Sequence, residues 1–332
     1  MTSEQDPANQ FFELATVYRL SALLFAALEL DVFSLIPAAG APASAIARAL
    51  GVEEERLRLL LNPLAGMGIL TLRQDGGFAL PPAFAALLAH GPEYRGDQFL
   101  RHKEAAGHWL RLAEIVRGDG SSPAYYGELL QSASVQPYLE SIRRTNRPHA
   151  EAMLRRLADL IPRLRRVLDL GGGHGYYGER LLELNPALRV TVLDVEQSIA
   201  YCRERQQDNP NRERFDFLVG DARTHDLENA FDLVLINDLL HYFPMPEKAE
   251  IVRRGVRALA PGGTLALMKV RLDAAGVRPP SSALFSLMVF VNTQCAWLES
   301  DAEAEELLRQ AGLRELRTLQ LHEERTLLLG VR

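Results

Sequence analysis

The chain has 332 residues, of which 47% are hydrophobic and 24% are charged, a composition typical of a globular enzyme with room for two domains. Its net charge of −6 argues against a nucleic-acid partner held by phosphate contacts. Its two cysteines, Cys202 and Cys295, lie far apart without a secretion signal, so we expect reduced thiols in a cytoplasmic protein.

The first long apolar segment predicts a helix over Phe11–Leu28. It is apolar on nearly all sides, more than one face of a small domain would bury, so we expect a partner chain or a second domain to cover it. Its most apolar part, Leu20–Leu28, ends at Glu29, which is too short to span a membrane. The segment therefore predicts association between protein surfaces and no membrane partner.

The next segments predict a winged helix. Helices are expected at Ala43–Leu50 and Glu53–Met67, followed by a hairpin of Ile69–Leu72 and Phe78–Leu80 around a glycine turn. The second helix begins with three consecutive glutamates, whereas a DNA-reading helix presents basic or amide side chains. We therefore expect residues 1–100 to form a dimerisation module without a nucleic-acid partner.

Residues 101–332 are predicted to hold a helical linker and a second domain. The stretch Glu93–Pro162 has helical character, with breaks at Gly118–Pro123 and at Pro137. It carries ring-bearing side chains that would line a pocket or simply pack: His102, His108, Trp109, Tyr125, Tyr126 and Tyr138.

From Arg166 onward, predicted strands and helices alternate, which implies a parallel sheet with crossover helices. The candidate strands are Arg166–Leu170, Arg189–Leu193, Phe215–Val219, Phe231–Ile236 and Thr264–Val270. A helix over Asp301–Ala311 would precede a closing pair of strands at Leu313–Leu319 and Thr326–Gly330. The second domain is therefore predicted to be α/β.

A glycine-rich turn follows the first of these strands, ahead of a predicted helix at Tyr176–Leu184. Asp169 precedes glycines at alternate positions, Gly171, Gly173 and Gly175. A dinucleotide fingerprint requires glycines at positions one, three and six, and position six here is a tyrosine. A strand, a glycine turn and a helix N-terminus form a cradle, and this spacing suits a ligand with an amino-acid end and no pyrophosphate.

Polar side chains follow the next strands, where ligands bind in open parallel sheets. They are Asp194 with Val195, Asp221 with Ala222, and Asn237 with Asp238. By spacing, Asp194 is expected to grip ribose hydroxyls, and Asp221 to accept from an adenine amino group. Each aspartate is alternatively a turn or helix-capping residue.

These features together resemble the S-adenosylmethionine (SAM)-dependent small-molecule methyltransferases of the plant-type O-methyltransferase family. The segments that carry the resemblance are Phe11–Phe33, Ala45–Leu70, Val167–Gly175, Phe231–Phe243 and Leu259–Leu265. The resemblance covers nearly the whole chain. It implies a winged-helix dimerisation domain, a class I Rossmann-like sheet with an antiparallel edge strand, and a homodimer. It also implies SAM as cofactor, S-adenosylhomocysteine as product, and a small, aromatic hydroxyl-bearing acceptor in secondary metabolism.

The resemblance places the catalytic base at His241, just past a predicted strand end, where a near-neutral pKa would suit proton removal. Packing against the next helix is the alternative role. The family's fifth strand usually ends in an acid that orients this histidine, but Lys269 stands there, and Glu299 is one position from the second supporting acid. Lys269 would instead hold a substrate carboxylate or pair with Asp238.

A carboxylate-bearing acceptor would suit a C-methyltransferase acting on a 2-oxo acid, with a metal assisting enolate formation. N-methylation is a further alternative, and so is a SAM-binding catalyst or regulator that does not methylate. The sequence has no clustered metal-ligand spacing, so we expect no metal site.

The acceptor site is the least defined part of the sequence. The resemblance places Phe285, Met288 and Asn292 in it, with His102 and Trp109 as further candidates, although such side chains more often belong to a core. His174 is expected to shape the glycine turn, and His322 to lie on the surface.

Overall fold

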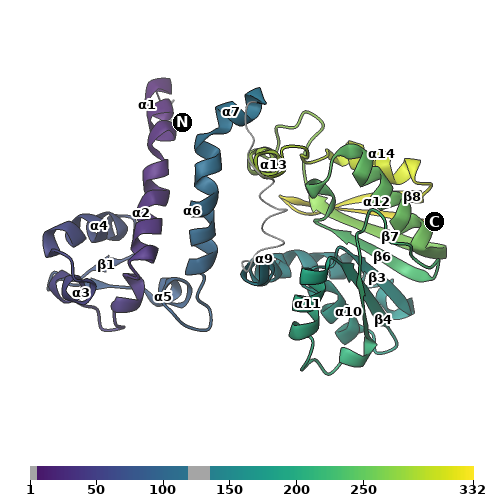
Figure 1. The fold of residues 1–332 in the computed structure, drawn as a ribbon, viewed down its shortest axis with the longest axis horizontal. Coiled ribbons are helices and arrows are strands. Elements are labelled where there is room, and N and C mark those ends of the chain that lie inside the picture. Colours follow the sequence, from purple (N-terminus) through teal and green to yellow (C-terminus); the bar gives the residue numbers. More distant parts are fainter. Residues whose placement is uncertain (1–5, 119–134) are drawn as a thin grey trace. The chain divides into compact units, whose positions relative to one another are not determined.

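The computed structural model describes residues 6–118 and 135–332, so the predicted pocket residues Tyr125 and Tyr126 lie outside the described chain. The chain divides into two compact units, Met1–Leu110 and Arg111–Arg332, which are described separately (Figure 1).

Unit 1 is helical with one short hairpin. Its helices are α1 (Pro7–Thr16), α2 (Tyr18–Glu29), the 3₁₀ turn η1 (Phe33–Leu35), α3 (Ala43–Leu50), α4 (Glu54–Gly66), α5 (Pro82–Leu88) and α6 (Gly96–Leu110). The hairpin pairs β1 (Thr71–Leu72) with β2 (Phe78–Ala79) in antiparallel register. Phe33 and Phe78 are completely enclosed in its core. This arrangement agrees with the predicted helix, turn, helix and hairpin.

The predicted helix over Phe11–Leu28 is present and begins earlier, at Pro7; only the turn residue Val17, whose backbone stays helical, divides it into α1 and α2. Large apolar side chains on this stretch are exposed within one chain, among them Phe11 at 71% and Leu14 at 63%. By length and composition, the whole stretch Pro7–Glu29 is also sufficient to cross a membrane. The segment Leu20–Leu28 is therefore only part of a longer apolar stretch, Pro7–Glu29.

Unit 2 contains a seven-stranded sheet in the order β5-β4-β3-β6-β7-β9-β8. Its strands are β3 (Arg166–Leu170), β4 (Arg189–Asp194), β5 (Phe215–Val219), β6 (Phe231–Asn237), β7 (Leu259–Val270), β8 (Arg314–His322) and β9 (Arg325–Val331). The first five are parallel, and β9 is antiparallel to both β7 and β8. The antiparallel strand therefore lies one place inside the edge, which β8 forms.

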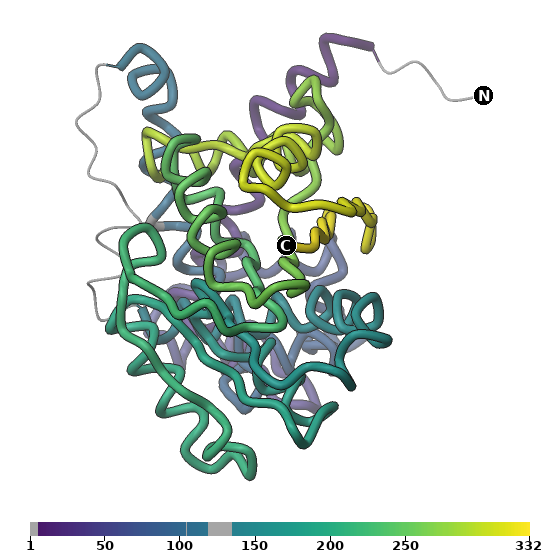
Figure 2. The backbone as a smooth tube through the Cα atoms, turned by 90° about the vertical axis from the view of Figure 1, so that its right-hand side faces the viewer, coloured from purple at the N-terminus to yellow at the C-terminus, as the bar shows by residue number. Residues whose placement is uncertain are grey.

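Helices α9 and α10 pack on one face of this sheet, and α12 and α14 pack on the other. The helices of unit 2 are α7 (Leu112–Arg117), α9 (Val135–Arg156), η2 (Ile161–Arg163), α10 (Tyr176–Leu184), α11 (Glu196–Arg205), η3 (Arg212–Arg214), η4 (Leu240–Tyr242), α12 (Met245–Ala258), α13 (Pro280–Thr293) and α14 (Asp301–Gln310). The chain can be followed to the yellow C-terminal strands in Figure 2.

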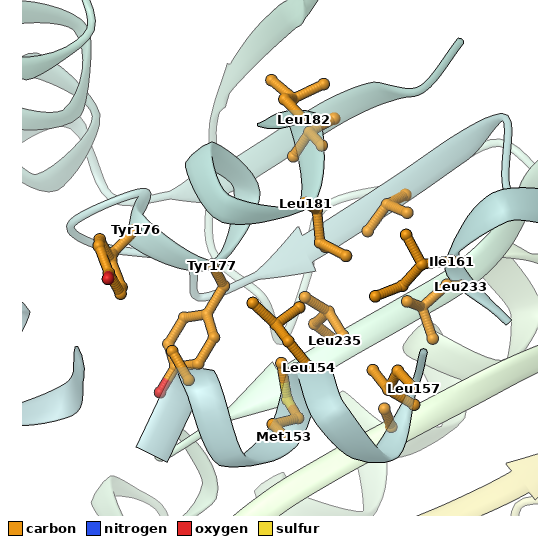
Figure 3. Close-up of a cluster of buried hydrophobic side chains, with 14 of the residues drawn as sticks. Met153, Leu154, Leu157, Ile161, Tyr176, Tyr177, Leu181, Leu182, Leu233 and Leu235 are labelled. Atoms are coloured by element: carbon orange, nitrogen blue, oxygen red, sulfur yellow. The ribbon is translucent and has the colours of Figure 1, made fainter. Parts of the chain in front are cut away.

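Alternating strand residues explain the two layers, because successive side chains on a strand point to opposite faces. Val167 packs with α9 and α10, whereas Leu168 packs in the cluster that includes α12 and α14. Figure 3 shows the first cluster, in which Leu154 of α9 lies near Leu181 of α10 and Leu235 of β6. The buried strands leave their carboxyl ends at one edge, where the loops carry the polar residues singled out above.

Candidate active site

A cavity of about 330 Å³ lies within unit 2, at the carboxyl ends of β3 to β6. Most of the predicted cofactor residues line it: Asp169, Gly171, Gly173, Asp194, Val195, Asp221, Ala222, Asn237 and Asp238. Gly175 lies at the start of α10 and does not line the cavity. Sequence segments more than sixty residues apart thus form one site.

The glycine turn requires residues without a side chain. Gly175 has a φ of 67°, and a Cβ there would stand 2.4 Å from the Cys202 Sγ atom. His174 accepts a hydrogen bond through Nδ1 from the Tyr176 N–H at 3.2 Å, so it does shape the loop. Burial lowers the pKa of His174 to about 3, which keeps the ring neutral as that contact requires.

Asp169 is completely buried at the end of β3. Within the described part of the chain, neither carboxylate oxygen has a hydrogen-bond partner. Burial, with a further contribution from the Asp194 charge, raises the pKa of Asp169 to about 7. A buried carboxylate without donors is costly, so this position favours a ligand that brings a cation or N–H donors.

Asp194 uses its two oxygens to order the turn. It accepts from the Gly173 N–H at 2.8 Å and from the Val195 N–H at 2.7 Å. This geometry matches the turn-capping role weighed in the sequence analysis. Each carboxylate oxygen can accept more than one hydrogen bond, and Asp194 lines the cavity, so ribose contact remains compatible with capping.

Asp221 is held by an arginine that the sequence analysis did not identify. The Arg223 guanidinium donates to Asp221 at 2.6 Å and to Glu247 at 2.7 Å. Hydrogen bonding from Arg223 lowers the pKa of Asp221, so its carboxylate is ionised. Arg223 also lies over the Phe243 ring, 5.3 Å from the centroid, and both line the cavity.

Asn237 ends strand β6, and Asp238 follows it directly. The side-chain nitrogen and oxygen of Asn237 are buried without a hydrogen-bond partner among the residues described. Asp238 has a φ of 50°, an uncommon conformation that Asp tolerates better than most residues. Its carboxylate lies 3.4 Å from the Arg325 Nε atom of β9. Asn237 and Asp238 therefore both line the cavity, next to each other in the chain.

His241 lies in η4 and is 6% exposed. Its ring meets Phe285 edge-on at 5.5 Å between centroids and lies 4.2 Å from the Tyr242 ring. Burial lowers the pKa of His241 to about 3, and the nearby Lys248 and Arg325 charges act in the same direction. The ring is therefore neutral at pH 7. It forms no hydrogen bond with a side chain of the described residues.

Glu299 forms a buried ion pair with Lys248 of α12, at 2.5 Å. Both side chains are 1% exposed, and the Lys248 ammonium also donates to the Trp297 carbonyl at 2.6 Å. The lysine was missed in the sequence because nothing local distinguishes it from a surface residue of an amphipathic helix. The structure thus places Glu299 against a lysine.

Lys269 is also paired, with Asp301 at the start of α14, at 2.8 Å. The expectation that Lys269 pairs with Asp238 was wrong, because Asp238 is paired with Arg325 instead. Asp301 additionally accepts from the Thr326 hydroxyl at 2.9 Å. The Lys269 charge is therefore already compensated inside unit 2.

The predicted acceptor residues fall in both units. Phe285, Met288 and Asn292 lie on α13 of unit 2, and the Asn292 side-chain oxygen is buried without a partner in the described chain. His102 and Trp109 lie on α6 of unit 1. Across the described residues, no group of three His, Cys, Asp or Glu side chains is arranged to hold a metal ion.

His322 lies at the surface only in part. It stacks on His149 of α9, with 2.6 Å between the His149 Nδ1 and His322 Nε2 atoms. Tyr138, one of the ring-bearing side chains expected to line a pocket or to pack, does line the cavity. Further lining residues were not identified from the sequence: Leu139, Ile142, Asn146, Tyr177, Ser198, Tyr242 and Phe243. Those from α9 carry no local signal, because only the fold brings that helix to the strand ends.

Comparison with protein families gives two matches. Residues 124–314 match the O-methyltransferase domain, and residues 12–88 match the O-methyltransferase dimerisation domain.

Curated relatives span the same length. The chain is 29% identical over 323 residues to a 3-hydroxy-5-methyl-1-naphthoate 3-O-methyltransferase of Streptomyces sahachiroi, covering 92% of this chain and 90% of that protein. It is 29% identical to the acetylserotonin O-methyltransferase of Bos taurus, covering 92% of each.

Two solved structures share the whole fold. An O-methyltransferase family protein from Burkholderia thailandensis superposes with a TM-score of 0.89 at 25% identity, covering 99% of this chain and 98% of that one. PigF, solved with S-adenosylhomocysteine (SAH), superposes with a TM-score of 0.88 at 25% identity, covering 98% and 99%.

Proposed function

The chain belongs to the O-methyltransferase family, and on this premise we propose that it methylates a hydroxyl group of a small aromatic acceptor. It is a SAM-dependent methyltransferase, and the predicted α/β fold with a helical dimerisation region is confirmed. The proposal concerns the acceptor, the atom that is methylated and the residues that act on it.

The cavity of unit 2 fits the cofactor by its own chemistry. Its buried, unpartnered polar side chains include an acid, Asp169, and an amide, Asn237, which match a ligand that carries an ammonium group. When bound, S-adenosylmethionine supplies the methyl group from a sulfonium and is converted to S-adenosylhomocysteine. These unpartnered groups are the observation that carries the proposed site.

The proposed contacts follow the order of the strands. Asp169, Asn237 and Asp238 would hold the amino-acid end, with the backbone of Gly171 and Gly173 allowing close approach and Gly175 shaping the turn before α10. Asp194 and Val195 would hold the ribose. Asp221 and Ala222 would face the adenine, with Asp221 fixed in place by Arg223.

We assign the general base to His241. Its neutral ring can accept the proton of an acceptor hydroxyl at one nitrogen and later release it to solvent. Phe285, Met288 and Asn292 of α13 would line the acceptor. Aligning the acceptor oxygen with the methyl group is then a matter of positioning.

Glu299 and Lys269 take supporting roles in this proposal. Each is one half of an ion pair within unit 2, with Lys248 and Asp301 respectively. Pairing leaves Lys269 little attraction for a substrate carboxylate, which disfavours a 2-oxo acid as acceptor.

We further propose a homodimer that buries the exposed apolar surface of α1 and α2, in a cytoplasmic protein. The residues that match the dimerisation domain, 12–88, include the second half of α1 and all of α2. Burial against a second copy would account for side chains that otherwise face water.

The test is transfer of labelled methyl from SAM into two pools of acceptors, one of phenols and hydroxynaphthalenes and one of 2-oxo acids, each with and without a chelator. Label in a phenolic ether, unaffected by the chelator, is the expected result. Label confined to a 2-oxo acid would replace the proposal with C-methylation, and loss with chelator would add a metal.

A further inference from the structure

Among the described residues of unit 2, His241 has no carboxylate partner, and this affects which acceptor hydroxyls it can deprotonate. In a histidine base supported by an acid, the carboxylate orients the ring and stabilises the imidazolium that forms. Here the aromatic rings of Phe285 and Tyr242 lie against the His241 ring. No acidic side chain of the described residues is hydrogen-bonded or ion-paired to His241.

Two carboxylates near η4 are already ion-paired with cationic side chains. Glu299 is paired with Lys248 at 2.5 Å, and Asp238 lies 3.4 Å from the Arg325 guanidinium. Those same two cations, Lys248 and Arg325, are the charges that act on the His241 ring, and both oppose its protonation. A proton taken up by His241 would therefore add a third positive charge at a buried position.

A neutral imidazole in such a site is a weak base. The acceptor hydroxyl must therefore lose its proton more readily by itself. Helix α12, which carries Lys248, packs against η4, which carries His241. We propose that the enzyme selects acceptors whose hydroxyl is acidic, such as a phenol conjugated with a carbonyl or quinone group, and that the Lys248–Glu299 pair sets this selectivity. This inference rests on the proposed O-methylation and narrows its substrate class.

The step balances without a further reactant. For an ionised acceptor, an oxygen lone pair forms the O–CH₃ bond while the electron pair of the breaking C–S bond goes to sulfur. No proton moves in that case. For an acceptor that is still protonated, the proton goes to His241 and then to solvent, and this path is slow because imidazolium is disfavoured here.

The first experiment uses the full-length wild-type enzyme and a series of phenols of similar size that differ in hydroxyl acidity through distant ring substituents. We expect kcat/KM to rise with acidity by about 100-fold or more across the series at constant pH. Equal rates across the series would overturn the inference while leaving O-methylation intact. Absence of any phenolic ether would instead overturn the proposed function.

A second readout does not depend on turnover. A chromogenic nitrophenol acceptor, bound in the presence of S-adenosylhomocysteine, reports its own ionisation through its absorption band. We expect the anionic band to dominate at a pH where a less acidic phenol of the same size stays neutral when bound. A neutral nitrophenol in the complex would contradict the inference.

A matched pair of variants tests the role assigned to Lys248. Lys248→Gln removes the cation and keeps the Glu299 carboxyl group without its partner, whereas Lys248→Gln with Glu299→Gln removes both members of the pair. The single variant is expected to raise kcat/KM for the least acidic phenols relative to the double variant and to flatten the acidity dependence. Thermal unfolding checks that both variants fold. Identical dependences in two folded variants would exclude Lys248 and Glu299 as the determinant.

Discussion

The cofactor cavity and the surroundings of His241 lie at the same end of the sheet. They differ in whether their buried polar and charged side chains have partners. In the cavity, Asp169 and Asn237 are enclosed without hydrogen-bond partners among the described residues. Around His241, buried charges are paired, as in Lys248 with Glu299 and Lys269 with Asp301. Unpartnered buried groups are costly, whereas paired ones hold each other in place.

The two regions therefore have different roles: the cavity binds a ligand, and the ion pairs near His241 stabilise the folded structure. The cavity gains its missing donors when a cationic ligand enters, so its polar groups contribute to affinity. The pairs near His241 are complete without a ligand, so they contribute to the stability of unit 2 and to the electrostatic setting of the histidine. Substitutions in the two regions should therefore change different measurable quantities.

The largest expected effect is on turnover. His241→Ala should lower kcat by about 10²- to 10⁴-fold for a phenol of ordinary acidity, because general acid–base catalysis is lost. The affinity for S-adenosylhomocysteine, measured by calorimetry, should not change, since His241 does not line the cofactor cavity. Unchanged turnover in the variant would remove His241 from the proposed mechanism.

The next effect is on stability. Glu299→Gln leaves Lys248 charged and unpaired in the interior, which should cost about 3–5 kcal/mol of the free energy of unfolding of unit 2. The matched control is Asp216→Asn, which breaks the exposed pair with Arg189 and should cost about 0–1 kcal/mol.

Urea denaturation can resolve the two variants through tryptophan fluorescence. The chain has two tryptophans, and a Trp109→Phe background leaves Trp297, whose carbonyl accepts from Lys248, as the reporter of unit 2. Equal losses of stability in the two variants would show that the buried pair is not the support described here.

The smallest effect concerns the glycine turn. Gly175→Ala should destabilise unit 2 by about 1–3 kcal/mol, because φ is 67° and the added Cβ would meet the Cys202 Sγ atom at 2.4 Å. Gly107→Ala is the control, since a Cβ there meets nothing within 4 Å in helix α6. It should stabilise unit 1 by about 0.5–1 kcal/mol. A neutral Gly175→Ala would contradict the tight turn.

Much of the fold could be predicted because its signals are local. The strands at Arg166–Leu170 and Phe215–Val219 match the prediction residue for residue, since short apolar runs bounded by turns define them. Strand β7 begins at Leu259, five residues before the predicted start, because Leu259 pairs with Phe231 of β6 across an irregularity in the register. That pairing depends on the fold and leaves no local signal in the sequence.

The candidate site also contains residues that the sequence could locate and residues that it could not. The acids after the strands could be located, because each follows a buried run directly. Their partners could not, because a side chain such as Lys248 meets Glu299 across 51 residues of sequence. Arg325 reaches Asp238 only because β9 inserts between β7 and β8, a placement that spacing alone does not define.

The central claim is that a cationic ligand completes the cofactor cavity, and Asp169 gives the most direct test. Burial raises the pKa of this carboxyl to about 7, so at pH 6.5 most of the free protein carries the proton there. A cationic ligand favours the ionised form, so binding should release protons, and affinity should rise as the pH increases from about 6 to 8.

Calorimetry of SAM binding at pH 6.5, in two buffers that differ in ionisation enthalpy, measures this release. We predict a release of up to about one proton per site in the wild-type protein and none in Asp169→Asn, which should also bind SAM about tenfold or more weakly, the cost of one buried hydrogen-bonding group. A binding heat that does not depend on the buffer, or an unchanged proton release in Asp169→Asn, would contradict the account.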